Sequence, residues 1–143
     1  MGGPLMERIL KDGAKVREGF QELILQPQSD LPHFRHFLSE IGWEIVREEM
    51  IKEDGKFYPM MKAVRNNSGK KTVYTEEEAW FGPLLLEKRH PVLKEYLLLE
   101  EMIRKKILAG LSGAESVSAK TRLAEVKEEM ELIHTALKRY ESI

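Results

Sequence analysis

The pattern of hydrophobic and polar positions over the first 65 residues predicts a strand, a helix and a β-hairpin. Three consecutive aliphatic residues predict a strand over 22–26, and the unbroken apolar run indicates that both of its faces are buried. Apolar residues at helical spacing predict a helix over 30–41. Two β-rich runs, at about 44–51 and 57–64, flank Asp54-Gly55, the dipeptide typical of a type I′ turn. The order of elements indicates an α/β domain.

Beyond residue 65 the period becomes helical. Thr75 and Glu78 are spaced as a capping box at the start of a short helix. A long helix is expected from Pro91 or Val92 to about Ala109. A Gly/Ser-rich turn leads to a last helix, whose apolar residues fall at alternating spacings of 3 and 4, the seam of a coiled coil: Leu123, Val126, Met130, Ile133, Leu137 and Tyr140. Two long helices joined by a short turn predict an antiparallel hairpin.

Two residues lie at the carboxyl end of the first predicted strand, the edge at which an open α/β sheet places its binding sites. Gln26 and Pro27 occupy this position. The amide of Gln26 could read the edge of a base or could cap the next helix, and the sequence favours neither. Ser29 or Asp30 is a further candidate for that cap, and Gly42 is placed to end the helix.

Composition and charge narrow the possible functions. The 143 residues include 23 basic and 24 acidic side chains, which excludes a uniformly basic nucleic-acid coat but leaves local basic clusters. There are no cysteines, so disulfides, Cys-ligated zinc and a cysteine nucleophile are excluded. The four histidines have no metal-ligand spacing, and we expect no metal site. Neither a signal peptide nor an apolar run of about 20 residues is present, so we expect a cytoplasmic protein without a membrane span.

Several motifs follow one another in a fixed order: Met1-Gly2-Gly3-x-Leu5-x-x-x-Ile9-Leu10, Leu23-Ile24-Leu25-Gln26-Pro27, Arg35-x-x-Leu38, Gly42-Trp43, Glu53-Asp54-Gly55-Lys56-x-Tyr58 and Phe81-Gly82-Pro83. This ordered string resembles the bacterial S-adenosyl-L-methionine (SAM)-dependent tRNA (adenine(22)-N1)-methyltransferases, the TrmK family. The sequence departs from the family pattern at Gln28, where Asn is usual, and at Pro59, where an acidic residue is common.

The resemblance implies the C-terminal half of a class I (Rossmann-like) methyltransferase sheet, with strands in the order 5-7-6, followed by an antiparallel helical hairpin or coiled coil. The expected division is a partial methyltransferase domain over 1–65, a linker with short helices over 66–91, and the helical extension over 92–143. The Gly-rich SAM loop and the first three strands of the family have no counterpart in these residues. We therefore expect the chain alone to be inactive.

The resemblance also implies roles for particular residues, with SAM as cofactor and tRNA as partner. Met1, Gly2 and Gly3 would bind SAM, and Gln26, Pro27 and Gln28 would line the pocket of the target base. No catalytic residue is identified. The tRNA would be contacted by a set of mostly basic side chains: Arg35, His36, Lys56, Lys88, Arg89, Arg104 and Lys105.

An alternative interpretation is an interaction module without enzymatic activity. The helical hairpin would bind RNA, or the chain would form a homo-oligomer. The apolar edge of strand 22–26 and the seam of the last helix both favour self-association.

Overall fold

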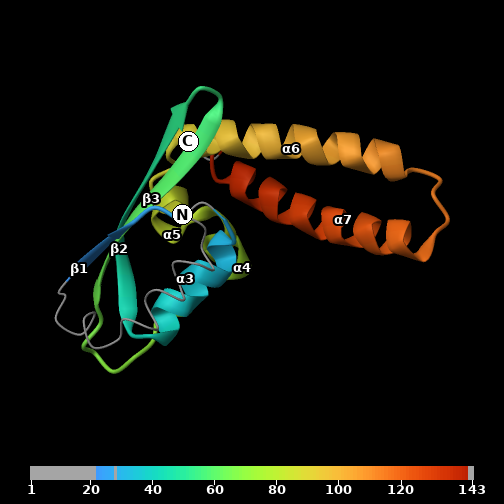
Figure 1. Cartoon of the computed structure of the whole chain (residues 1–143). Helices are drawn as coiled ribbons and strands as arrows, with labels where there is room; N and C mark the ends of the chain where they lie inside the picture. Colours follow the sequence, from blue (N-terminus) through green and yellow to red (C-terminus); the bar gives the residue numbers. More distant parts are fainter. Residues whose placement is uncertain (1–21, 28, 142–143) are drawn as a thin grey trace. The chain divides into compact units, whose positions relative to one another are not determined.

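The computed structural model describes residues 22–27 and 29–141 (Figure 1). The chain forms two compact units, Met1–His90 and Pro91–Ile143. The first is a mixed α/β unit and the second is helical.

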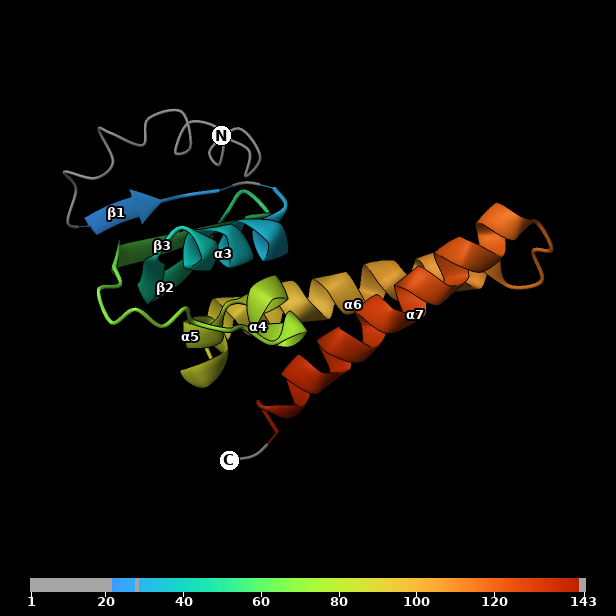
Figure 2. The same cartoon turned by 90° about the horizontal axis from the view of Figure 1, so that it is seen from below.

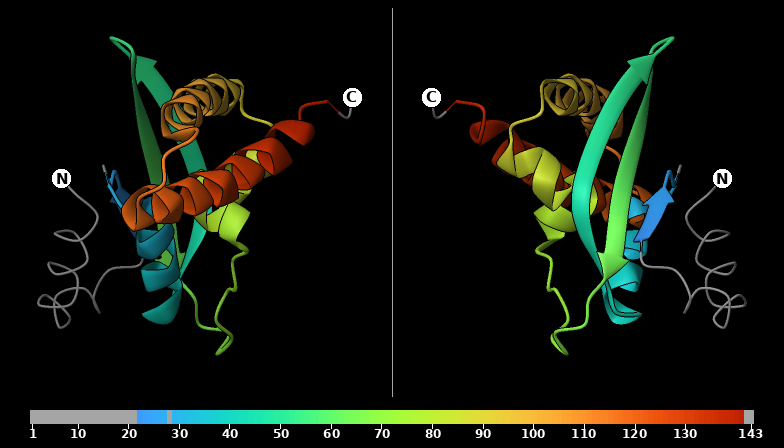
Figure 3. Two further views of the ribbon diagram at one scale, coloured as in Figure 1. Left: turned by 90° about the vertical axis from the view of Figure 1, so that its right-hand side faces the viewer. Right: turned by 90° about the vertical axis from the view of Figure 1, so that its left-hand side faces the viewer.

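The sheet of the first unit has three strands in the order β1-β3-β2, comprising β1 (Glu22–Leu25), β2 (Trp43–Glu53) and β3 (Lys56–Arg65). β3 is antiparallel to both neighbours. Asp54 and Gly55 both have positive φ, at 52° and 76°, as the predicted type I′ turn requires. The predicted strands and their 5-7-6 order are confirmed. Figure 3 shows the long β2–β3 hairpin continuing beyond the short β1.

A β-bulge in β2 decides which of its residues face the core. Ile45 lies opposite Ala63, but the register then shifts, so that Glu48 lies opposite Met61. Residues three apart on a regular strand would point to opposite faces, and the extra residue of the bulge returns Glu48 to the face of Ile45. A carboxylate is thereby placed in the core, where its side chain is only 1% exposed.

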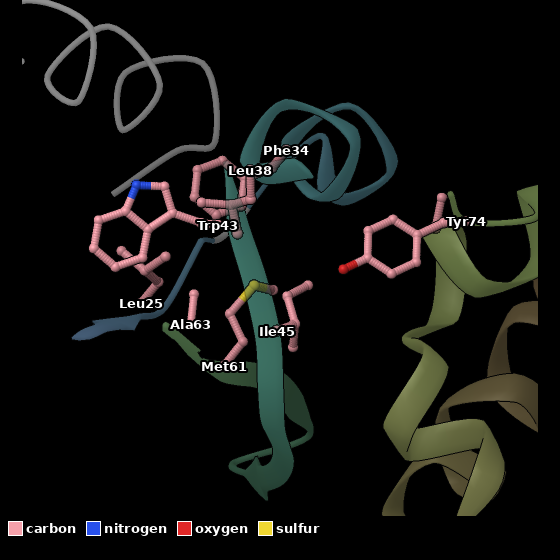
Figure 4. Close-up of a cluster of buried hydrophobic side chains, with 9 residues drawn as sticks. Leu25, Phe34, Leu38, Trp43, Ile45, Met61, Ala63 and Tyr74 are labelled. Atoms are coloured by element: carbon pink, nitrogen blue, oxygen red, sulfur yellow. The ribbon is translucent and has the colours of Figure 1, made fainter. Parts of the chain in front are cut away.

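The helix α3 (Leu31–Glu40) packs against this face of the sheet (Figure 2). Gly42, with φ of 84°, follows the helix as predicted. The N-cap residue of α3, Asp30, has a left-handed backbone conformation and its side chain makes no capping hydrogen bond. The predicted cap by Asp30 is therefore wrong, and the alternative cap by Ser29 stays a prediction. Figure 4 shows most of the core beside β2; its members are Leu25, Phe34, Leu38, Trp43, Ile45, Met61, Ala63, Tyr74 and Ala79.

The opposite face of β1 is open in the described part of the chain. Leu25 points to the core and is 8% exposed, whereas Ile24 points the other way and is 80% exposed. The prediction that both faces of this strand are buried is therefore wrong for these residues. Among the described strands β1 is also at the edge of the sheet, with β3 as its neighbour.

Of the predicted linker 66–91, residues 66–90 fall within the first unit and contain α4 (Glu76–Phe81) and α5 (Pro83–Glu87), and Pro91 begins the second unit. The capping box is confirmed: Thr75 Oγ1 accepts from the N–H of Glu78, and Glu78 Oε1 accepts from the N–H of Thr75. The segment buries large apolar side chains, including Phe81, Leu85 and Leu86. Burial also raises the pKa of Tyr74 above its usual value.

The second unit is an antiparallel pair of helices, α6 (Pro91–Leu111) and α7 (Val117–Lys138), as predicted (Figure 1). Ser116 caps α7 by accepting from the N–H of Ala119. Three residues of the predicted seam are buried, and a residue outside the seam, Ala136, is buried as well. The buried residues of α7 are Val126, Met130, Ile133 and Ala136. Neither helix, nor any other in the described ranges, is long and apolar enough to span a bilayer.

Candidate functional site

A pocket of about 290 Å³ opens where the pairing of β1 with β3 stops. The ladder ends with Leu25 opposite Met61, and the next positions in this register would place Pro27 opposite Pro59. Neither proline has an N–H to donate, so the ladder cannot continue through them. We call this the ladder-end pocket; its lining residues are Gln26, Pro27, Lys56, Phe57, Tyr58 and Pro59.

The lining of the ladder-end pocket combines flat apolar groups with few polar ones. Pro27 and Pro59 are buried, whereas Gln26 and Lys56 are exposed. The ammonium of Lys52 lies 5.6 Å from the ring centre of Phe57, at cation–π distance. The pocket thus offers aromatic surface, one amide and one ammonium, and its lining contains no carboxylate.

The pocket brings together three residues that the sequence analysis assigned to the site: Gln26, Pro27 and Lys56. Gln26 is an exposed residue of this lining and lies four residues before the N-cap residue of α3, Asp30. Gln28 and the proposed SAM residues Met1, Gly2 and Gly3 lie outside the described residues.

The position of Arg35 corrects its assignment to RNA. The side chain is 1% exposed, and its Nε and Nη2 lie 3.2 and 3.0 Å from Glu48 Oε2. Its Nη1 donates to the carbonyl of Ala79 at 2.6 Å. A phosphate cannot reach a guanidinium enclosed in this way. Arg35 therefore joins α3 to β2 and α4 and is not part of an RNA surface.

The same carboxylate explains the Phe81-Gly82-Pro83 motif. Glu48 Oε1 accepts from the N–H of Leu84 at 2.9 Å, which draws the start of α5 onto β2. A Cβ added to Gly82 would lie 2.6 Å from Glu48 Oε2, and Gly82 has a φ of 97°. Only glycine fits this conformation without displacing the ion pair.

Lys88 is also held within the first unit. Its Nζ donates to the carbonyl of Glu48 at 2.8 Å and to Glu49 Oε1 at 2.7 Å. His90 Nε2 lies 3.1 Å from Glu49 Oε2. The hydrogen bond from Lys88 holds the pKa of Glu49 below its usual value, against the opposing effect of burial. Much of the positive charge of Lys88 is therefore neutralised by Glu49.

The remaining residues assigned to RNA differ in accessibility. His36 and Arg89 are exposed. The side chain of Lys105 is 65% exposed and lies 3.7 Å from a Glu101 oxygen. Arg104 is 14% exposed and paired with Glu100 and Glu129, and its assignment to tRNA phosphates stays a prediction. No group of three or more potential metal ligands occurs within 22–27 and 29–141.

Sequence reasoning missed two features of this site. Tyr58 was part of a motif but had no role, because only the structure shows that it lines the pocket with Gln26. Glu48 was not singled out, because the bulge that buries it leaves no mark in the hydrophobic pattern.

The fold corresponds to one part of a Rossmann-like methyltransferase, which defines the class of protein. A structure from Streptococcus agalactiae, described as a protein of the NADB-Rossmann superfamily, superimposes with a TM-score of 0.82 at 26% identity, over 96% of this chain and 56% of that one. A structure from Streptococcus pneumoniae, described as a candidate tRNA (m1A22) methyltransferase in complex with SAM, has a TM-score of 0.80 at 25% identity, over 96% and 56%.

The sequence comparisons give the family. The profile of the tRNA (adenine(22)-N(1))-methyltransferases, TrmK, matches residues 1–135, and the chain belongs to this family. A curated tRNA (adenine(22)-N(1))-methyltransferase from Bacillus subtilis is 27% identical over 136 residues, which make up 93% of this chain and 57% of the relative. The chain thus spans less than two thirds of the length of that relative.

Proposed function

We propose that the protein containing this chain transfers a methyl group from SAM to N1 of an adenine in tRNA, and that the first unit supplies the side of the site that holds the target base. Membership of the TrmK family carries the proposal. The ladder-end pocket, at the carboxyl end of β1, is where such folds bind ligands.

The chemistry of the acceptor suits a pocket that holds a base. N1 lies on the Watson–Crick edge, so the adenine must leave its pairing before it can react. N1 of adenine has a lone pair and no proton, so its methylation requires no general base. The residues of this pocket therefore have to bind and orient the base. We propose that Lys56, which lines the same pocket, binds a phosphate of the same RNA strand.

Rossmann-like folds commonly hold the ribose of their cofactor with an Asp or Glu, and the lining of the ladder-end pocket contains neither. We therefore assign this pocket to the target base and not to the ribose of SAM. SAM supplies the methyl group in this family. We propose that its binding depends on residues 1–3 together with parts of the relatives that this chain does not match.

A fusion tests the proposal. The chain is joined to the part of the Bacillus subtilis enzyme that it does not match, and is supplied with tRNA and isotopically labelled SAM. We expect N1-methyladenine in the tRNA, detected by nucleoside mass spectrometry, and no transfer by the 143-residue chain alone. A fusion that binds both SAM and tRNA but forms no N1-methyladenine would contradict the proposed function. As a control, a fusion that carries Lys120→Ala in α7, outside the ladder-end pocket, should form N1-methyladenine at an unchanged rate.

A further inference from the structure

Gln26 is an exposed residue that carries a side-chain amide and lines the ladder-end pocket. A glutamine amide has an oxygen that accepts and an NH₂ group that donates, both in one plane. It can therefore form two hydrogen bonds with a partner that presents a donor beside an acceptor.

We propose that Gln26 selects adenine by binding its N6 and N7 atoms, leaving N1 free. This inference rests on the proposed function and deepens it. Adenine presents an N6 donor beside an N7 acceptor, the pattern that a glutamine amide matches in a two-bonded contact. On the same edge guanine presents O6 and N7, which are both acceptors, so one of the two bonds is lost. Pyrimidines have no N7. The Watson–Crick edges of all four bases also present a donor beside an acceptor, so the selection of adenine requires that the pocket turn the Hoogsteen edge toward Gln26.

The contact leaves the reacting atom open. N6 and N7 form the Hoogsteen edge of the adenine, whereas N1 lies on its Watson–Crick edge. An amide that holds the first edge does not cover the lone pair of N1. Recognition and methylation of one base are therefore compatible.

The aromatic residues of the pocket supply a stacking surface that binds every base with similar affinity. Phe57 has Lys52 beside its ring, and Tyr58 is the second aromatic residue of the lining. Stacking on such groups is similar for every base, so the choice of adenine falls to Gln26.

The test uses the 143-residue chain and short pyrimidine-rich RNA strands, each with a single adenine, guanine or 7-deazaadenine at one position. In 7-deazaadenine a CH group replaces N7. Dissociation constants are measured by fluorescence anisotropy. We expect wild-type protein to bind the adenine strand about tenfold more tightly than either of the other strands.

Two variants test whether the preference for adenine arises from residues of the ladder-end pocket. Gln26→Ala should lose about tenfold on the adenine strand and show no further loss with 7-deazaadenine, because the contact to N7 is already absent. Tyr58→Leu should weaken binding of all three strands equally. Circular dichroism serves to check that each variant is folded. Because Gln26 is exposed, we expect its replacement to leave the core intact.

The outcomes separate this inference from the proposed function. RNA binding with equal affinity for the three strands, or unchanged discrimination in Gln26→Ala, would overturn the role of Gln26 and leave the proposed function standing. A folded chain that binds none of the strands would overturn both the inference and the RNA-binding part of the proposed function.

Discussion

Arg35 and Glu48 form a buried ion pair in which two guanidinium nitrogens, Nε and Nη2, contact one carboxylate oxygen at 3.2 and 3.0 Å. Each side chain is 1% exposed. The pair also binds the carbonyl of Ala79 and the N–H of Leu84, so it connects α3, β2, α4 and α5. Because the ion pair holds α4 and α5 to the sheet, these two helices are an integral part of the first unit.

Removal of one member of the pair should strongly destabilise the chain. Arg35→Met or Glu48→Gln leaves a buried group without its partner, and we expect each to lower the free energy of unfolding by about 3–5 kcal/mol. The double variant should lose less than the sum of the two. Urea unfolding followed by circular dichroism measures all three. Losses below about 1 kcal/mol in both single variants would show that the pair is dispensable.

Gly82→Ala should be destabilising by more than about 1 kcal/mol, because it combines an unfavourable φ of 97° with a Cβ placed 2.6 Å from Glu48 Oε2. Gly110→Ala provides the matched control. Gly110 lies in α6 with nothing within 4 Å of the added Cβ, so this change should stabilise the helix by about 0.5–1 kcal/mol. Thermal unfolding distinguishes the two, and equal shifts in melting temperature would refute the steric account.

Acid should weaken the contact between β2 and the end of α5. The hydrogen bond from Lys88 lowers the folded-state pKa of Glu49 below 4.5, its usual value. A lowered pKa stabilises the fold above the unfolded value, and this contribution is lost as the pH falls through the folded-state pKa. Glu49→Gln should therefore reduce the dependence of the melting temperature on pH between about pH 5 and pH 3. An unchanged profile would contradict this role of Glu49.

Features that depend on neighbouring residues in the sequence were predicted well. The Asp54-Gly55 turn and the Thr75–Glu78 capping box are both set by a few adjacent residues, and both are confirmed. The order of the strands followed from the resemblance to the family and is also confirmed.

Features that depend on contacts between distant segments were not predicted. Arg35 has a charged side chain, which is typical of the surface. It is buried because the bulge between Ile45 and Arg47 turns Glu48 inward as its partner. Ile24 has the aliphatic side chain typical of a core residue, yet it is 80% exposed, because it points to the face of β1 opposite Leu25 and the core. The ladder-end pocket required the register that places Pro27 beside Pro59, which neither segment reveals alone.

The open face of β1 predicts self-association. Ile24 is 80% exposed on a strand at the sheet edge, and apolar edge strands tend to pair with other chains. Multi-angle light scattering at increasing concentration should detect oligomers, and Ile24→Lys should reduce them. Val73, which is 88% exposed outside the sheet, provides the control, and Val73→Lys should leave association unchanged. A strict monomer at high concentration would contradict the prediction.

The most direct test of the central claim, that this chain holds the RNA-binding side of the site, is the affinity of the 143-residue chain for tRNA at several salt concentrations. We expect the logarithm of the association constant to fall linearly with the logarithm of salt concentration. Lys56→Ala should reduce the magnitude of the slope by about one, whereas Lys120→Ala should not. A folded chain with no salt-dependent tRNA binding, or with a slope unaffected by Lys56→Ala, would contradict the claim.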